Sequence, residues 1–201
     1  MISLTKRFLY VHVPKTAGNA TQTALVEFAE DQLFANPRQD GIQRFSLQNQ
    51  YGTHKHSSLS EYLTALGPAL FWNLTRFATV RNPWERAVSF YFSPHRNTTT
   101  WDRSAFVRTL YELQPMSWFL CLAEGQRIPP GKQAIDVLLR YEPLDVDFQV
   151  LCGQLGIPQQ PMPLRNVGKH HPYTHYYDAE LIALVAARFA DDIHQFGYHF
   201  P

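Results

Sequence analysis

Residues 8–21 read FLYVHVPKTAGNAT, and they shape the predicted architecture more than any other part of the chain. The predominantly apolar residues 8–13 predict a short buried strand, and residues 14–18 predict a turn. A helix is expected next, with Asn19 as its N-cap and Gln22 three residues later. This helix is expected to carry an apolar stripe at helical spacing, made of Leu25, Phe28, Ala29 and Leu33.

The turn between this strand and this helix has the composition of an anion-binding loop. Its small residues allow backbone N–H groups to approach an anion closely, and the N-terminus of the following helix adds about half a positive charge. Lys15 contributes a full positive charge beside it. The order of residues differs from the P-loop motif GxxxxGK[ST], because the lysine precedes Gly18. An ordinary turn with an exposed lysine is the alternative interpretation of this segment taken alone.

A second strand-to-helix turn is predicted further along the chain. Residues 77–80 predict a buried strand, and the RNPWERAVSFY sequence of residues 81–91 predicts the start of a helix. Asn82 is expected to cap this helix, Pro83 to occupy its first position, and Glu85 to complete a capping box. The apolar stripe expected on this helix consists of Trp84, Ala87, Val88 and Tyr91.

Arg81 and Ser89 are the candidate anion-binding side chains of this second segment. Arg81 leaves the strand just before the helix cap, where its planar guanidinium group can bind a phosphate with two hydrogen bonds. Ser89 lies nearly opposite the apolar stripe, so core packing does not account for it. A phosphate lying beside the helix could contact both residues. The alternatives are a surface salt bridge for Arg81 and a solvated Ser89.

Strands alternate with helices along the rest of the chain, which predicts an α/β fold with a largely parallel sheet. Ligands of such sheets lie beyond the carboxyl ends of the strands, where both segments fall. The segment at 37–56 is expected to be polar and irregular, and helices are expected at residues 59–66 and 144–155, the second ended by Gly156. Helices with loops are expected at 98–132 and a strand at 135–141. A final helix is expected to be capped by Asp178 and to carry an apolar stripe of Leu181, Leu184, Val185 and Phe189.

The composition indicates a single globular domain spanning residues 1–201, since 45% hydrophobic residues suffice for a full core. A net charge of +1 argues against a broad nucleic-acid-binding surface. The lack of a long apolar run argues against a membrane span, and the lack of a signal peptide leads us to expect a cytoplasmic location. Cys121 and Cys152 are far apart in the sequence, so we expect neither a disulfide framework nor a zinc site. The oligomeric state stays open.

Taken together, PKTAGNAT at residues 14–21 and RNPWERAVSFY at residues 81–91 resemble the two donor-binding segments of the sulfotransferase superfamily that uses PAPS (3'-phosphoadenosine-5'-phosphosulfate). The likeness is closest to the branch of carbohydrate O-sulfotransferases and their bacterial relatives. HKHSS at residues 54–58 and RYE at residues 140–142 also resemble segments of this family. The resemblance implies a P-loop-NTPase-like three-layer fold, in which helices flank a largely parallel central sheet.

The resemblance also assigns residues to the donor. It implies that the 5'-phosphosulfate is bound by Lys15, Thr16, Ala17, Gly18, Asn19, Ala20 and Thr21. It further implies that Arg81 and Ser89 bind the 3'-phosphate. The family often has hydroxyl residues directly after the glycine, whereas this chain has Asn19 and Ala20. We expect Thr21 or the Asn19 amide to replace that hydroxyl contact.

The implied reaction moves a sulfuryl group from PAPS to a hydroxyl group by in-line displacement and leaves 3',5'-ADP. Lys15 is expected to stabilise the charge that builds up on the bridging and sulfuryl oxygens. A histidine is suited to act as the general base near neutral pH, and the resemblance points to His56, with His54 as the alternative. No metal is expected. The expected acceptor bears a hydroxyl group and is a carbohydrate or another small molecule.

Two functions from other classes stay open at this point. One is a P-loop kinase or NTPase that uses ATP and Mg²⁺, although the missing GxxxxGK[ST] motif argues against it. The other is a non-catalytic binding module on the same fold, which Asn19 and Ala20 favour because they depart from the donor-binding pattern.

Overall fold

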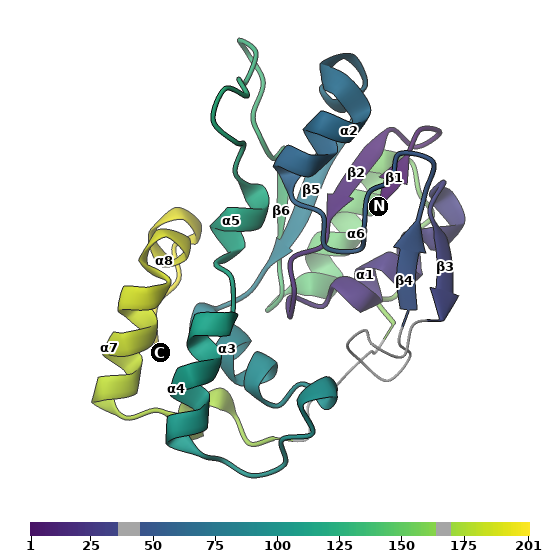
Figure 1. Ribbon diagram of the computed structural model, residues 1–201. Helices are drawn as coiled ribbons and strands as arrows, with labels where there is room; N and C mark the ends of the chain where they lie inside the picture. Colours follow the sequence, from purple (N-terminus) through teal and green to yellow (C-terminus); the bar gives the residue numbers. More distant parts are fainter. Residues whose placement is uncertain (36–44, 164–169) are drawn as a thin grey trace.

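The computed structural model describes residues 1–35, 45–163 and 170–201 (Figure 1). The strand order of its main sheet is β1-β2-β5-β6. These strands are β1 (Ile2–Ser3), β2 (Phe8–Val11), β5 (Thr75–Val80) and β6 (Val137–Arg140). β5 runs parallel to β2 and to β6, whereas β1 is antiparallel to β2. The predicted α/β fold with a largely parallel sheet is therefore confirmed.

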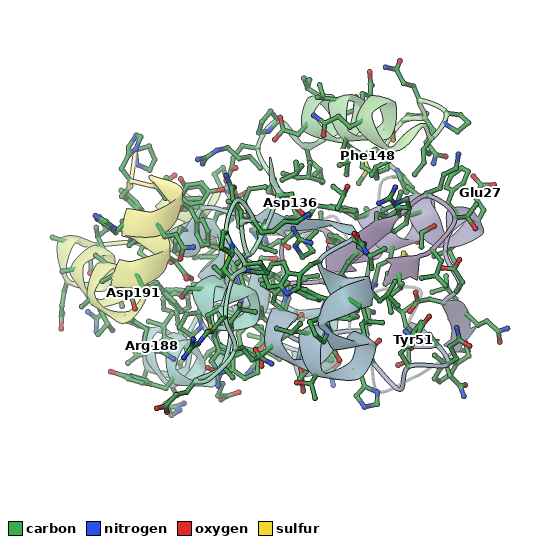
Figure 2. The ribbon with its side chains drawn as sticks, turned by 90° about the horizontal axis from the view of Figure 1, so that it is seen from above. Glu27, Tyr51, Asp136, Phe148, Arg188 and Asp191 are labelled. Atoms are coloured by element: carbon green, nitrogen blue, oxygen red, sulfur yellow. The ribbon has the colours of Figure 1, made fainter. Side chains whose placement is uncertain are left out.

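The sheet is covered by helices on both faces, which makes three layers. Successive side chains of β2 point to opposite faces and are all buried, as is typical of a parallel sheet. Leu9 and Val11 pack in one cluster with residues of α2 (Leu59–Phe71) and α5 (Met116–Leu120). Phe8 and Tyr10 pack in another with residues of α1 (Gly18–Leu25) and α6 (Leu144–Leu155). Figure 2 shows Phe148 of α6 on one side of the sheet and α2 on the other. The expected three-layer arrangement is confirmed.

The helices that carry the two candidate segments begin at the same edge of the sheet. Val11 of β2 pairs with Ala78 of the parallel strand β5, so both strands end at this edge. β2 leads from there into α1, and β5 leads into α3 (Pro83–Tyr91), as Figure 1 shows. The predicted apolar stripe of α3 is buried against α4 (Arg103–Glu112) and α7 (Ala179–Arg188) in a third hydrophobic cluster.

The remaining elements are short. They are the 3-10 turns η1 (Val26–Phe28), η2 (Pro94–Arg96) and η3 (Tyr173–Tyr176), the two-stranded antiparallel sheet of β3 (Gln32–Ala35) and β4 (Phe45–Gln48), and helix α8 (Ala190–Phe196). Among the described residues, no helix combines the length and the apolar character that crossing a membrane would require.

The first helix differs from its prediction at both ends. Its N-cap is Ala17, which adopts a left-handed conformation with φ of 69°, so Asn19 lies inside the first turn instead of capping it. The helix ends at Leu25, and the backbone has an extended conformation at Ala29. The Glu30 N–H then donates to the Ile2 carbonyl at 3.0 Å, which draws the chain toward β1 and places Leu33 in a strand. Tertiary pairing has overridden the apolar stripe.

Other boundaries also differ. The segment at 37–56, expected to be irregular, contains β4, while residues 36–44 lie outside the described part of the chain. The helix expected at residues 59–66 continues to Phe71 across a kink at Gly67. The predicted final helix is divided into α7 and α8, because Phe189 leaves helical geometry between them. The helix Leu144–Leu155, ended by Gly156, is confirmed.

Candidate active site

The turn after β2, which we call the Lys15 loop (residues 14–18), has a strained backbone. Lys15 and Ala17 both adopt left-handed conformations, with φ of 68° and 69°. For a residue with a side chain this conformation costs of order 1–3 kcal/mol and is concentrated at functional sites. Thr16 between them is fully buried, and its hydroxyl donates to the Val13 carbonyl at 2.9 Å. Its side chain therefore holds the loop in shape, and only its backbone is placed to bind a ligand.

The loop presents backbone donors at the N-terminus of α1. The N–H groups of Ala20 and Thr21 both donate to the Ala17 carbonyl, at 2.9 and 3.2 Å. Among the described residues, the N–H groups of Thr16, Ala17 and Gly18 make no backbone hydrogen bond of good geometry. Successive N–H groups at a helix N-terminus form a favourable site for an anion, to which the helix dipole adds positive potential. The predicted character of the loop is thus supported by its geometry.

Arg81 connects the second segment to this loop. Its Nη1 donates to the Lys15 carbonyl at 3.2 Å, and its Nη2 pairs with Glu85 Oε1 at 2.9 Å. The guanidinium group lies 3.7 Å above the centre of the Tyr141 ring. Arg81 is only 7% exposed, and its Nε has no hydrogen-bond partner in the part of the chain that the structure describes. This buried position differs from the surface salt bridge that was the alternative for Arg81.

Ser89 lies on the side of α3 that faces the loop. Residues four apart share one side of a helix, so Glu85 and Ser89 of α3 are aligned. Glu85 binds Arg81. Ser93 follows Phe92, the C-cap of the helix, and its hydroxyl accepts a hydrogen bond of 2.8 Å from Lys15 Nζ. Ser89 lies between Glu85 and Ser93 along the chain, one helical turn after Glu85. It is half-buried, and its hydroxyl makes no hydrogen bond among the described residues.

Arg86 anchors the start of the Lys15 loop through a hydrogen bond to Pro14. This residue was not identified from the sequence. It is 1% exposed, and it donates from Nε to the Pro14 carbonyl and from Nη2 to the Gln114 carbonyl, both at 2.9 Å. Burial lowers the pKa of Arg86 to about 10, an effect that the nearby Asp192 opposes. The group remains cationic at neutral pH. The residues around Arg86 in the sequence carry no pattern that indicates this role.

His56, in the segment before α2, contacts His12, the residue that directly follows β2. Its Nδ1 lies 3.2 Å from the carbonyl oxygen of His12. Because a carbonyl can only accept, Nδ1 carries the proton and Nε2 is the basic nitrogen of the neutral ring. An open depression of about 260 Å³ adjoins His56, and it is lined by polar side chains of Ser46, His54, Lys55, His56, Ser57 and Glu61.

His12 is a second histidine of the site that sequence reasoning missed. It is 4% exposed, and its ring centroid is 4.4 Å from that of His56. Burial holds the pKa of His12 well below its ordinary value, and the nearby His56 and Lys55 lower it further. His12 is thus a neutral imidazole at neutral pH. Its position at the end of a buried strand, where the chain turns toward a ligand loop, is the signal that could have found it.

The predicted site residues are brought together with some changes of detail. Asn19, Ala20 and Thr21 are buried in the first turn of α1, and the Thr21 hydroxyl lies 3.5 Å from the Ala17 carbonyl. Asn82 caps α3 as predicted by accepting from Trp84 N–H. Glu85 does not complete the capping box, because it pairs with Arg81, and the Asn82 N–H donates instead to Glu142 at 2.9 Å.

Comparison with known proteins identifies the family of the chain. Residues 1–110 match a family model described as "Sulfotransferase family", which spans more than half of the 201 residues. The matched region contains the Lys15 loop, His56 and the Arg81–Ser89 segment. No curated protein and no solved structure matches the chain. Within the described residues, no group of three or more His, Cys, Asp or Glu side chains is placed to hold a metal ion.

Proposed function

Because the chain belongs to the sulfotransferase family, we propose that it moves the sulfuryl group of PAPS to a hydroxyl group of an acceptor and releases 3',5'-ADP. Membership of the family supports sulfuryl transfer in general. The observation that carries the choice of donor is the contact between Arg81 and the Lys15 carbonyl. It places two cationic segments side by side, as a ligand with separate 3'-phosphate and 5'-phosphosulfate groups requires.

Each segment has its own part in donor binding. The N–H groups of Thr16, Ala17 and Gly18, with the N-terminus of α1, bind the 5'-phosphosulfate. The Nε of Arg81, buried without a hydrogen-bond partner in the described residues, and the hydroxyl of Ser89 bind the 3'-phosphate. A bound phosphate would supply hydrogen-bond acceptors to both groups. Binding of PAPS would therefore remove the free-energy cost of leaving the Arg81 Nε–H group buried without an acceptor.

The transfer step is an in-line displacement at sulfur. The acceptor oxygen forms a bond to sulfur while the bond from sulfur to the 5'-phosphate oxygen breaks. The acceptor proton passes to Nε2 of His56, and the released electron pair stays on the phosphate oxygen of 3',5'-ADP. Lys15 stabilises the negative charge on that oxygen. His56 is suited to the base role because its Nδ1 is held by the His12 carbonyl.

The acceptor approaches through the depression beside His56. The lining residues that the structure describes carry hydroxyl, imidazole, ammonium and carboxylate groups, and none of these described residues is aromatic other than histidine. Such a lining favours an acceptor with several polar groups over a flat apolar one. We therefore place a carbohydrate, or another small molecule with several hydroxyl groups, ahead of an apolar alcohol.

Donor binding is tested first. In a thermal-shift comparison, 3',5'-ADP is expected to raise Tm by stabilising the native state, whereas ATP with Mg²⁺ at the same concentration is expected to have little effect. A larger shift with ATP and Mg²⁺ would favour a kinase or NTPase instead. Acceptors are then screened with ³⁵S-labelled PAPS. Binding of 3',5'-ADP without transfer to any acceptor would point to a non-catalytic module.

The base assignment is tested by His56→Gln in the same assay. A general base typically contributes about 100-fold or more to the rate, so the variant is expected to bind 3',5'-ADP normally and to lose transfer by that factor. His54→Gln separates the two candidate histidines. His194→Gln is the matched control, because His194 is exposed on α8. Normal turnover of His56→Gln would remove His56 from the base role.

A further inference from the structure

The glycine at position 18 is required by a neighbouring side chain. A Cβ atom built on Gly18 would lie 1.8 Å from Cδ2 and 1.9 Å from Nε2 of His12. The φ angle of Gly18 is not in the left-handed region, so its backbone conformation is open to any residue. The close approach of the His12 imidazole, and not the turn itself, therefore excludes a side chain at position 18.

The His12 ring has little room to move away. Its Nδ1–H donates to Oε1 of the fully buried Gln22 in α1 at 2.9 Å. The rings of Tyr10 and His56 pack against it, with centroids 6.1 and 4.4 Å away. Gln22 has no second hydrogen bond within the described residues, since its Nε2 is buried without a partner there. The imidazole is thus confined between α1, the sheet and His56.

The backbone of His12 contacts the same histidine. Its carbonyl oxygen is the atom that faces Nδ1 of His56 at 3.2 Å. His12 therefore contacts Gly18 at the start of α1 with its ring and His56 with both its ring and its carbonyl. Through these contacts, a single residue bridges the proposed donor-binding loop and the proposed general base.

We infer that His12 is a positioning residue, whose ring acts as a spacer between Gly18 and His56 and so sets the distance from the Lys15 loop to the base. This inference rests on the proposed function. His12 is 4% exposed, and its Nδ1 proton is engaged by Gln22. A buried ring with its proton engaged in this way can orient its neighbours, but it is not placed to exchange protons with a substrate. A displacement of about 1 Å at a reacting group can reduce a rate about 100-fold, so the spacing matters for catalysis.

A double-mutant cycle tests the contact between the ring and Gly18. Gly18→Ala is expected to lower Tm and to weaken binding of 3',5'-ADP, measured by calorimetry, by about tenfold or more, because the added methyl group overlaps the ring. In the His12→Ala background, Gly18→Ala is expected to change neither quantity further. Gly153→Ala is the matched control, since a Cβ on that helical glycine would meet nothing within 4 Å. Equal effects of Gly18→Ala in both backgrounds would overturn the spacer role.

The link to the base is tested by imidazole ¹⁵N NMR, which reports the tautomer of His56 without any ligand. The Nδ1–H form is expected to predominate in the native protein and in His12→Phe, which keeps a ring in place. His12→Ala keeps the backbone carbonyl but removes the ring that packs against His56, so Nδ1 is expected to move away from the carbonyl and both tautomers to be populated. An unchanged His56 signal in His12→Ala would refute the inference. Failure of the native protein to bind 3',5'-ADP would instead refute the proposed function, while the Tm cycle and the NMR comparison would still decide whether His12 spaces Gly18 from His56.

Discussion

Nη1 of Arg81 donates a hydrogen bond to the carbonyl oxygen of Lys15 over 3.2 Å, across 66 residues of sequence. The same guanidinium group pairs with Glu85 and stacks on the ring of Tyr141. The planar guanidinium group makes all three contacts at once, and the ammonium group of a lysine cannot reproduce them. The convergence of the two candidate segments therefore depends on the identity of this side chain and not only on its charge.

Arg81→Lys is expected to weaken binding of 3',5'-ADP by about 10- to 100-fold, because the ammonium group cannot bind both the Lys15 carbonyl and a phosphate with a planar fork. Isothermal titration calorimetry measures the change directly. Arg103→Lys provides the control, since Arg103 is 44% exposed and pairs with Asp178 and Glu180 at the surface. Equal affinity of Arg81→Lys and the native protein would show that the 3'-phosphate is bound elsewhere.

Ser89→Ala is expected to separate ligand binding from stability. Because the Ser89 hydroxyl makes no hydrogen bond within the described residues, its removal should leave Tm within about 1 °C of the native value, while the lost hydrogen bond to a charged phosphate weakens binding of 3',5'-ADP by about tenfold or more. Ser104→Ala, at an exposed position of α4, should change neither quantity. A loss of stability without a loss of affinity would mean that Ser89 is structural.

Arg86→Met is expected to destabilise the protein by about 2 kcal/mol or more, because the Pro14 and Gln114 carbonyls lose their donor inside the protein. The free energy of unfolding in urea is the measurement. Since Pro14 begins the Lys15 loop, affinity for 3',5'-ADP should fall as well. Arg108→Met tests the loss of a charge alone at an exposed position of α4. Native-like stability of Arg86→Met would exclude the anchoring role.

The sequence predicted what depends on local pattern. The order strand, turn and helix around Lys15 and around Arg81 follows from neighbouring residues, and so does the cap at Asn82. The contacts that build the site join residues distant in sequence. Lys15 and Ser93 are 78 residues apart, and Arg86 and Pro14 are 72 apart. Sequence periodicity does not predict such contacts, because they depend on how the helices and the sheet pack against one another in the folded protein.

The position of Asn19 illustrates a local failure with a non-local cause. Asparagine before a helix is a good N-cap, but here the cap is the left-handed Ala17, and the helix starts at Gly18. The early start brings Gly18 beneath the His12 ring and Gln22 to its Nδ1. The buried histidine, which propensity rules do not consider, is thus part of the reason that the helix begins where it does.

The buried imidazole of His12 should also make stability depend on pH. Burial, followed by the nearby His56 and Lys55, holds the pKa of His12 in the folded protein well below 6.5, its ordinary value and the value expected in the unfolded chain. Below pH 6.5 the unfolded state therefore binds a proton that the folded state does not. The resulting stabilisation is complete above pH 6.5 and is lost as the pH falls, by up to about 1.4 kcal/mol per pH unit.

His12→Asn removes this titration and should therefore reduce the loss. Between pH 7.5 and pH 5.5, urea unfolding should show that the native protein loses more stability than the variant, by roughly 1 kcal/mol, because one proton is taken up only on unfolding. His194→Asn, at an exposed position, should follow the native protein. An identical pH dependence for His12→Asn and the native protein would mean that His12 titrates alike in both states, which would contradict its burial beside Gly18.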